Sequence, residues 1–324
     1  MDFLGIDISK ADFHVHLLQG AHSAKRSFPN APAGYAQLDR WLKNRKSTAL
    51  HACMEATGAY WLGLATHLHA SEVAVSVVNP ARIKSFARSQ LRRTKTDVVD
   101  AEIIADFCRT QAPGRWEPPL REHQEIRALL TYRDHLVAEK VRAKQLIATV
   151  YQADVFQLTA RAHQKQLEDL IDSTEKQMRA LIASTPSLLQ ATQLLESIPG
   201  IGWLTAASLA VRLPMDRLST SKAAAAHAGL TPRERQSGTS VHGRPRICKT
   251  GDAQLRKALY MPALAALRGT SHLAQFGARL KAAGKPGKVV IAAMMRKLVT
   301  IAYAILKSGQ PFTIPPTLDM QHSI

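Results

Sequence analysis

Apolar and polar positions alternate along the first third of the chain in a pattern that predicts strands and helices in turn. Strands are predicted at 2–8, 12–18, 49–54 and 73–78. Helices are predicted at 33–44 and 59–70, and in the segment "TDVVDAEIIADFCRT", where Thr96 is the expected N-cap. Strands that alternate with helices are typical of an α/β domain, which we place at residues 1–120.

The pattern changes to long helices at residues 121–185. Two series of apolar residues recur there close to heptad spacing, separated by the segment "YQADVFQ". Narrow apolar seams of this kind predict an antiparallel coiled-coil arm, which serves assembly or packs on the chain's own domain. The first series is Leu129, Tyr132, Leu136, Ala143, Leu146 and Val150, and the second is Leu167, Ile171, Thr174, Met178 and Leu181.

Residues 186–324 are predicted to form a mainly α-helical, basic domain. In the segment "LLESIPGIGWLTAASLA", Gly200 and Gly202 lie between two helical patterns. Backbone N–H groups left exposed by glycines can face a phosphate, as they do in helix-hairpin-helix elements that bind DNA. A turn between two packed helices would have the same pattern, so the residues alone leave both interpretations open.

Charge narrows the range of partners. The chain has 43 Lys and Arg against 25 Asp and Glu, a net charge of +18, of which residues 230–324 carry +12. Charge concentrated in this way favours a nucleic-acid partner over an evenly solvated surface. A second basic tract contains no acidic residue and consists of Arg82, Lys84, Arg88, Arg92, Arg93 and Lys95.

Membrane insertion and secretion are not expected. The most apolar run, "VVIAAMM", ends at Arg296 and Lys297 and is far shorter than a membrane span. The first ten residues carry acids where a signal peptide needs a basic region. Cys53, Cys108 and Cys248 lie far apart in the sequence and form neither a disulfide framework nor a zinc motif. We therefore expect a cytoplasmic protein with no membrane partner.

Four carboxylates occupy positions from which they can converge. Asp7 ends the first predicted strand, Glu55 ends the strand "HACME", and Asp97 and Asp100 are three residues apart at the start of a helix. Each acid alone would be an ordinary surface residue or a helix cap. Together they offer hard oxygen ligands for Mg²⁺ or Mn²⁺, the ions that assist phosphodiester displacement.

The segment "RQSGTSVHGRPRICKTG" surrounds Ser237 with cations. Without other information it is a polar turn, because a serine hydroxyl has no lowered pKa and needs activation by a base or a metal. His242 is either such a base or a phosphate ligand, and Thr239 and Ser240 are alternative hydroxyl groups. The arginines that would neutralise a phosphate beside Ser237 are Arg235, Arg244 and Arg246.

Two sets of motifs resemble a known family. "GIDISKADFHV", "MEATGAYW" and "TKTDVVDAEIIADF" look like the DEDD tetrad of insertion-sequence transposases of the IS110 (IS-one-ten) family. "AGLTPRERQSGTSVHGRPRICKTGDAQLRKALYMPA" resembles the C-terminal signature of the same family. Relatives of that family include Piv-type DNA invertases and bridge-RNA-guided recombinases. Because two unrelated signatures match in the family's order over nearly the whole chain, the resemblance is specific.

The resemblance implies a RuvC-like, RNase H-fold domain with Asp7, Glu55, Asp97 and Asp100 as catalytic ligands of Mg²⁺ or Mn²⁺. It also implies that Ser237 is a nucleophile that forms a covalent phosphoserine link to DNA, so that strands are cut and rejoined. The expected partners are donor and target DNA, a structured guide RNA and further copies of the chain, as a dimer or tetramer at the bacterial nucleoid. Two alternatives are a Holliday-junction resolvase or RuvC-like nuclease that uses water, and a non-enzymatic nucleic-acid-binding protein.

The residues assigned to nucleic-acid binding come from both basic regions and from the glycine-containing turn. In addition to the tract from Arg82 to Lys95, they are Gly200, Gly202, Arg233, Arg235, Arg244, Arg246, Lys249 and Arg256.

Overall fold

The computed structural model describes residues 1–47, 49–56, 58–90, 97–150, 154–237, 241–268 and 272–313. Of residues 97–99, 234–237 and 241–245 only the backbone is described. The chain forms two compact units, Met1–Pro119 and Leu120–Ile324.

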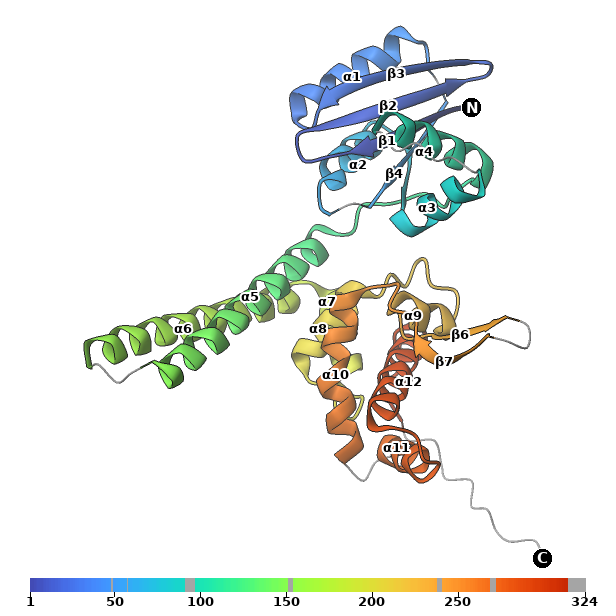
Figure 1. Ribbon diagram of the computed structural model, residues 1–324. Coiled ribbons are helices and arrows are strands. Elements are labelled where there is room, and N and C mark those ends of the chain that lie inside the picture. The colour runs from blue at the N-terminus through green and yellow to red at the C-terminus, as the bar shows by residue number, and fades with distance from the viewer. Residues whose placement is uncertain are drawn as a thin grey trace, which may run out of the picture. The chain divides into compact units, whose positions relative to one another are not determined.

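The N-terminal unit is built on a five-stranded mixed sheet (Figure 1). Its strands are β1 (Asp2–Ile8), β2 (Asp12–Gln19), β3 (His22–Pro29), β4 (Leu50–Glu55) and β5 (Ala74–Val78). The strand order is β3-β2-β1-β4-β5, in which β1, β2 and β3 pair antiparallel and β1, β4 and β5 pair parallel. This mixed sheet confirms the RuvC-like, RNase H-type fold that the sequence predicts for this part of the chain.

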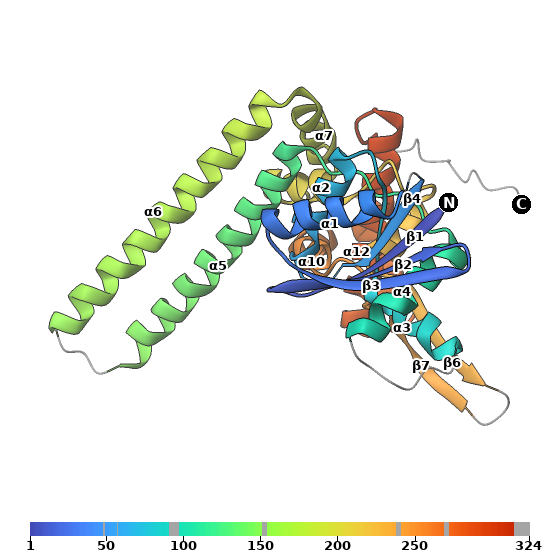
Figure 2. The same cartoon turned by 90° about the horizontal axis from the view of Figure 1, so that it is seen from above.

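Helices cover both faces of the sheet (Figure 2). Helices α1 (Pro32–Asn44) and α2 (Trp61–Ala70) bury one face, where Leu4 and Ile6 of β1 are fully buried. Helices α3 (Pro80–Ser89) and α4 (Asp97–Gln111) pack in a second apolar cluster that includes Cys53 of β4. Because side chains alternate along a strand, β1 and β4 present different residues to the two layers.

Strand β3 and helix α3 were not expected from the sequence. Strand β3 is an edge strand with one buried side chain, Phe28, so its residues lack the alternation of apolar and polar positions that identifies a strand. Helix α3 contains the first half of the basic tract and buries only Ile83. It begins at Pro80, with the Asn79 side chain as N-cap. The sequence pattern predicts the strand before this point but no helix directly after it.

Gly5 allows α4 to pack directly on β1. A Cβ at this position would lie 2.1 Å from the Ala101 carbonyl oxygen and 2.2 Å from the Ala105 nitrogen. Both atoms are backbone atoms, so a side chain at position 5 cannot be accommodated by a rotamer change. The first turns of α4 therefore lie against the centre of the sheet.

We expect Gly5→Ala to destabilise the N-terminal unit by about 3 kcal/mol, because overpacking against backbone forces the helix away from the sheet. The urea midpoint of this unit, followed by circular dichroism, measures the effect. Gly114→Ala is the control, since an added Cβ there meets no heavy atom within 4 Å. Equal midpoints for the two variants would contradict the close packing of α4 on β1.

The predicted arm is a pair of antiparallel helices, α5 (Arg121–Thr149) and α6 (Asp154–Ser184) (Figure 2). At its base Ile126 and Met178 are fully buried in the core of the C-terminal unit, and in its middle Leu136 packs with Leu167. In α6 the first four residues of the predicted series are buried, but Leu181 is only partly buried and its neighbour Ile182 is buried instead. Leu146, towards the other end of α5, is 49% exposed. The arm forms one compact unit with the residues that follow it.

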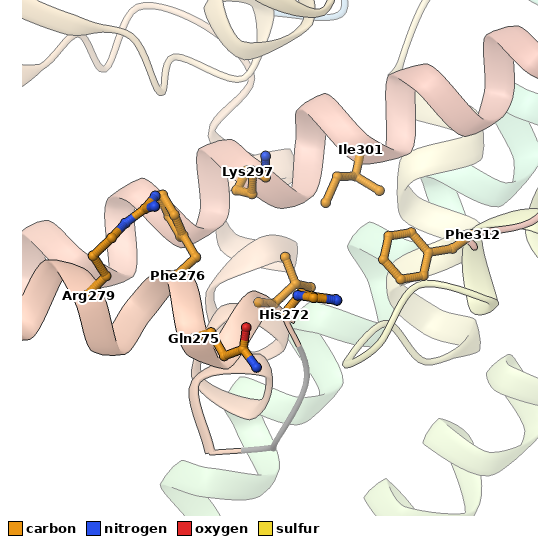
Figure 3. Close-up of a pocket in the computed structure, with 8 residues that line it drawn as sticks. His272, Gln275, Phe276, Arg279, Lys297, Ile301 and Phe312 are labelled. Carbon is orange, nitrogen blue, oxygen red and sulfur yellow. The ribbon is translucent and has the colours of Figure 1, made fainter. Parts of the chain in front are cut away.

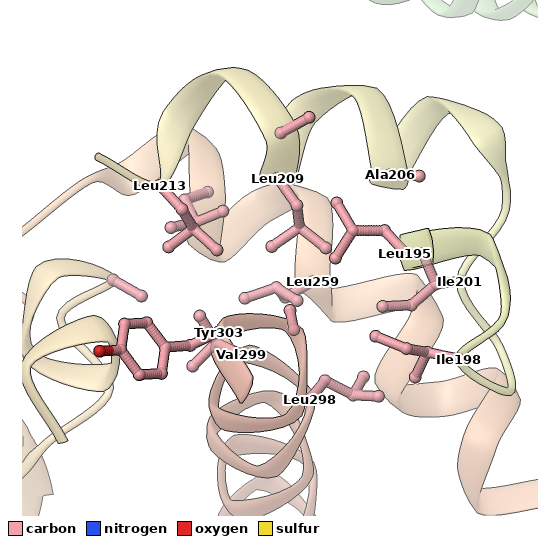
Figure 4. Packing of buried hydrophobic residues seen from close by; sticks show 14 of the residues in the cluster. Leu195, Ile198, Ile201, Ala206, Leu209, Leu213, Leu259, Leu298, Val299 and Tyr303 are labelled. Atoms are coloured by element: carbon pink, nitrogen blue, oxygen red, sulfur yellow. The ribbon is translucent and has the colours of Figure 1, made fainter. Parts of the chain in front are cut away.

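The rest of the C-terminal unit is mainly helical, as expected, with one hairpin. Its elements are α7 (Pro186–Glu196), α8 (Trp203–Arg212), α9 (Ser221–His227), β6 (Pro232–Ser237), β7 (Val241–Ile247), α10 (Ala253–Arg268), α11 (His272–Ala282) and α12 (Gly287–Ser308). Leu298 and Val299 of α12 pack with Leu259 of α10 and Leu209 of α8 in the centre of this core (Figure 4). By length and composition α12 is apolar enough to cross a membrane, but its buried residues form this core.

Candidate active site

Two of the four predicted carboxylates lie at the carboxyl ends of neighbouring strands, Asp7 one residue before the end of β1 and Glu55 at the end of β4. Strands β1 and β4 pair in parallel, with Ile6 opposite Met54. Asp7 and Glu55 are the next residue on each strand, and both side chains are half-buried. Residues at the same level of adjacent strands point to the same face of a sheet, so the two carboxylates project together from its carboxyl edge.

The face from which they project is the one that α4 covers. Gly5 lies under α4, and Asp7, two residues further along β1, has the same orientation. On β4, Cys53 is buried in the cluster with α4, and Glu55 is again two residues further. Asp7 and Glu55 are therefore on the α4 side of the sheet.

The direction of α4 brings its first turn to the same edge. Ala101 lies over Gly5, whereas the Cys108 Sγ, later in the helix, donates a hydrogen bond of 3.6 Å to the His51 carbonyl oxygen near the start of β4. The helix thus runs opposite to β1 and β4, and its N-terminal end lies over their carboxyl ends. Asp100 is half-buried in this first turn, and Asp97, one turn earlier, begins the helix.

Ser237 is the last residue of β6, in the other unit of the chain. Strands β6 and β7 form a two-stranded hairpin that projects from the helices around it (Figure 1). Ser237 is opposite Val241, and Arg233 is opposite Arg246. Where a polar loop was expected, the serine therefore ends a strand; Thr239 and Ser240 lie outside the described residues.

The base of this hairpin carries like charges on facing residues. Arg233 and Arg246 are both exposed and are Cα partners in the ladder. Like charges directly opposite each other destabilise a strand pair, and an isolated two-stranded hairpin has little stability of its own. A bound polyanion would remove this repulsion, so the hairpin suits contact with a phosphate backbone.

Both signatures of the chain match known families. Residues 4–153 match the DEDD transposases of the IS110 type, and residues 192–278 match the transposase IS116/IS110/IS902 family. The pilin gene-inverting protein of Moraxella lacunata is 35% identical to this chain over 96% of the chain and 97% of its own length. The chain belongs to the IS110 family of transposases.

Two further similarities are at lower identity. The transposase for insertion sequence element IS1328 of Yersinia enterocolitica is 26% identical over 96% of this chain and 98% of its own length. The Thermus thermophilus RuvC, solved in complex with a Holliday junction substrate, is 12% identical, with a TM-score of 0.28, and covers 36% of the transposase.

The DEDD transposase family implies a divalent metal ion, and the carboxylates at this edge are the type of donor that such an ion takes. Asp7, Glu55 and Asp100 supply carboxylate oxygens at one edge of the sheet, the ligands that Mg²⁺ and Mn²⁺ prefer. Among the side chains that the structure describes, no group of three His, Cys, Asp or Glu residues is arranged to hold a metal. The side chain of Asp97, the fourth predicted ligand, is not among those that the structure describes.

Two histidines of β2 lie on the same face and were not singled out from the sequence. His14 is the cross-strand partner of Asp7 and is half-buried, so it lies beside the carboxylate edge. His16 is the partner of Gly5 and is 3% exposed beneath α4, where burial and then Lys25 lower its pKa. The pattern "DFHVHLL" indicates that His14 and His16 share a face, because alternate residues of a strand point to the same layer.

Two cysteines that are distant in sequence meet under α4. Cys53 and Cys108 are buried in one cluster, whereas their spacing had placed them in separate settings. A hydrogen bond with Cys108, together with burial, raises the pKa of the Cys53 thiol. Both thiols are buried in this apolar cluster, and Cys108 lies near the start of β4, so we regard them as packing residues outside the carboxylate edge.

Part of the first basic tract lies beside this edge. Helix α3 directly follows β5, which runs parallel to β4, so its first turn is also at the carboxyl edge. Arg82, Lys84 and Arg88 are exposed, and the Arg82 guanidinium lies 5.2 Å from the centre of the Phe107 ring. The remaining predicted contacts of this tract, Arg92, Arg93 and Lys95, lie outside the described residues.

Some predicted phosphate contacts of the C-terminal unit have structural partners. The Arg256 Nη1 donates to the Ala228 carbonyl oxygen at 3.0 Å. Gly200 has a φ of +90°, and a Cβ there would lie 3.1 Å from the Pro262 carbonyl oxygen, so this glycine permits contact with α10.

Other predicted contacts of this unit have space around them. Gly202 precedes α8 with no heavy atom within 4 Å of a Cβ position, and Lys249 is exposed. Arg235 and Arg244 belong to the hairpin strands, and only their backbone is described.

Proposed function

We propose that this transposase cuts and rejoins DNA through a covalent phosphoserine intermediate, with Ser237 as the nucleophile. The observation that carries the proposal is that Asp7, Glu55 and the first turn of α4 lie at one edge of the sheet. The same chain has Ser237 as the last residue of the basic strand β6. Water-based hydrolysis would need the carboxylate edge alone. A serine nucleophile also accounts for the second signature of the family.

In the proposed reaction the Ser237 hydroxyl attacks the scissile phosphorus and a general base takes its proton. A phosphorus–oxygen bond to one DNA end breaks, and that end leaves with a hydroxyl group. A hydroxyl of another DNA end then attacks the phosphoserine, which restores the serine and joins the strand without ATP. A divalent ion held by Asp7, Glu55, Asp97 and Asp100 would polarise the phosphate and stabilise charge on the entering and leaving oxygens.

The basic residues bind and orient the DNA. Exposed cations of α3 lie beside the carboxylate edge, and Arg233 and Arg246 form a facing pair on the hairpin. Guanidinium groups bind phosphate in a bidentate manner and neutralise charge that develops on its oxygens. The related Moraxella lacunata protein is described as pilin gene-inverting. We therefore propose that this transposase acts on donor and target DNA, and that it does so at the nucleoid in the bacterial cytoplasm.

A trapping experiment tests the serine chemistry. The full chain is incubated with its own flanking DNA and Mg²⁺, denatured, digested with protease and nuclease, and examined by mass spectrometry. A nucleotide attached to the peptide that contains Ser237 supports the proposal. Cleaved DNA without an attached peptide would show instead that water is the nucleophile, as in a RuvC-like resolvase or nuclease.

The resemblance further supports a structured guide RNA that pairs with donor and target DNA. In such systems the protein contacts the nucleic-acid backbone and base pairing reads the sequence. The large positive charge of the chain suits that division of roles. Sequencing of RNA that copurifies with the transposase tests it, and a single RNA species from beside its gene is the expected result.

The arm is the proposed site of self-association, because recombination of two duplexes needs more than one active site. The distal parts of α5 and α6 expose apolar side chains, of which Val155 is 79% and Leu158 is 74% exposed. A cavity of about 760 Å³ lies between the two helices and is lined by Leu146 and Phe156, among others. Apolar surface that is exposed in this way usually marks an interaction site.

We expect Val155→Asp to shift the transposase to a smaller oligomer, because a charge at a packed apolar contact is costly to bury. Sedimentation velocity measures the change, and the thermal midpoint should stay within a few degrees. Val289→Asp is the matched control, since Val289 is 49% exposed at the start of α12, outside the arm. Identical sedimentation of the two variants would argue against association through the arm.

A further inference from the structure

The C-terminal unit contains a cavity of about 520 Å³ between α11 and α12 (Figure 3). Helix α11 contributes one face, on which His272, Gln275, Phe276 and Arg279 follow each other at helical spacing. Lys297 of α12 and Phe312, beyond the end of α12, line the opposite side. This volume is within the range that holds a small organic molecule.

Two aromatic rings line the cavity from different elements. Phe276 lies on α11, and Phe312 approaches from the other end of the cavity (Figure 3). Both side chains are half-buried, so each ring keeps an accessible part. Planar rings on two sides of an open cavity can stack on a flat, unsaturated ligand.

Both rings are held in place. The Phe312 backbone N–H donates to the Ser197 Oγ at 2.7 Å, which fixes the segment after α12 on the end of α7. On α11, a Cβ at Gly277 would lie 2.1 Å from the Leu267 Cδ2, so α11 packs closely on α10. The cavity therefore belongs to the rigid helical core and not to a loose surface loop.

The charge at the cavity is positive. The Arg279 guanidinium lies 5.6 Å from the centre of the Phe276 ring, and Lys297 is exposed on the facing helix. The lining that the structure describes contains no acidic side chain. The sequence from 253 to 313 has ten Lys and Arg and no Asp or Glu. An anionic ligand with a flat apolar part matches both the rings and the charge.

We propose that this cavity binds an unpaired nucleotide of single-stranded DNA. The base stacks between Phe276 and Phe312, and the flanking phosphates pair with Arg279 and Lys297. His272 and Gln275 offer hydrogen-bonding groups to the base edge. Single-stranded DNA is chosen because the family acts on DNA and strand exchange leaves bases unpaired. The inference rests on that action on DNA, but not on the serine nucleophile.

Binding of a labelled oligothymidine of roughly twelve residues to the full chain, followed by fluorescence anisotropy, tests the proposal. Phe276→Leu should weaken this binding about tenfold, because leucine fills the apolar space but cannot stack. Tyr260→Leu removes an exposed aromatic ring from α10, outside the cavity, and should leave binding unchanged. Binding of a duplex of the same length should be the same for both variants, since its bases are already stacked.

A charge variant supplies a second measurement. Arg279→Gln should reduce the slope of log affinity against log salt by about one, whereas Lys281→Gln, outside the cavity on the same helix, is the control. Equal slopes for these two variants would overturn the phosphate contact. Loss of duplex and single-strand binding to the same degree in Phe276→Leu would overturn the stacking role.

Crosslinking of the unmodified protein avoids any folding defect of the variants. An oligothymidine that carries 5-iododeoxyuridine should crosslink on irradiation to the peptide with Phe276 or the peptide with Phe312. Crosslinks confined to other peptides would overturn the proposal, and tighter Phe276-dependent binding of oligouridine would assign the cavity to RNA. The crosslinking is carried out without Mg²⁺ and needs no adduct at Ser237, so failure of the serine chemistry is distinguishable from failure of this inference.

Discussion

Asp7→Asn is expected to lower the rate of DNA cleavage by the transposase by about three orders of magnitude. Asp7 lies beside Glu55 and under the first turn of α4, so its carboxylate is central to the proposed metal site. Charge stabilisation by a metal ion is worth several kcal/mol in the transition state, and about 4 kcal/mol corresponds to a thousandfold in rate. Single-turnover cleavage of flanking DNA at saturating protein measures the loss.

The control for this prediction comes from α4. Asp100→Asn should reduce cleavage like Asp7→Asn, because Asp100 is in the turn that lies over the carboxylate edge. Asp106→Asn changes a carboxylate of the same helix that pairs with Arg109 instead, and should retain most of the activity. Binding of Mn²⁺, followed by electron paramagnetic resonance, should weaken in the first two variants only. Full cleavage by Asp7→Asn would exclude the proposed role of this edge.

Ser237→Ala is expected to abolish both the covalent adduct and strand joining, with a loss of at least about a thousandfold. Alanine removes the only oxygen of this side chain and leaves the strand pairing of β6 possible. DNA binding should persist because the cations of the hairpin remain. Trapped peptide–DNA adducts, counted by mass spectrometry, and joined product on sequencing gels measure the two effects.

Thr239→Ala and Ser240→Ala are the matched controls, because they remove hydroxyl groups two and three residues beyond Ser237. Both should form the adduct at Ser237. An adduct that survives in Ser237→Ala but disappears in one of these variants would move the nucleophile to that residue. Cleavage that continues in Ser237→Ala without any adduct would identify water as the nucleophile.

The carboxylate edge was predictable because its signals are local. Asp7 and Glu55 each follow a run of apolar residues that ends a strand, and Asp97 and Asp100 have the spacing of one helical face. The parallel pairing of β1 and β4 is what places the two strand-terminal acids side by side. His14, which lies opposite Asp7, escaped notice because nothing in its own neighbourhood indicates its cross-strand partner.

Roles that depend on distant contacts were assigned less well. Arg256 was predicted to bind nucleic acid, yet it also donates to the Ala228 carbonyl oxygen 28 residues away. Gly200 belongs to the turn between α7 and α8 as expected, but it faces α10. An arginine or a glycine in a basic sequence has the same local pattern whether it meets a phosphate or a backbone carbonyl.

By itself the sequence determined most strands and helices of the first unit, although not β3 and α3, together with the helical character of the second unit and the basic character of the serine segment. These properties follow from periodicity, charge and short spacings, which are set by neighbours along the chain. Only the tertiary structure decided which face of the sheet α4 covers, in which direction it runs, and that α11, α12 and Phe312 enclose a cavity. Those features arise from packing between residues far apart in the sequence, and no local pattern encodes such contacts.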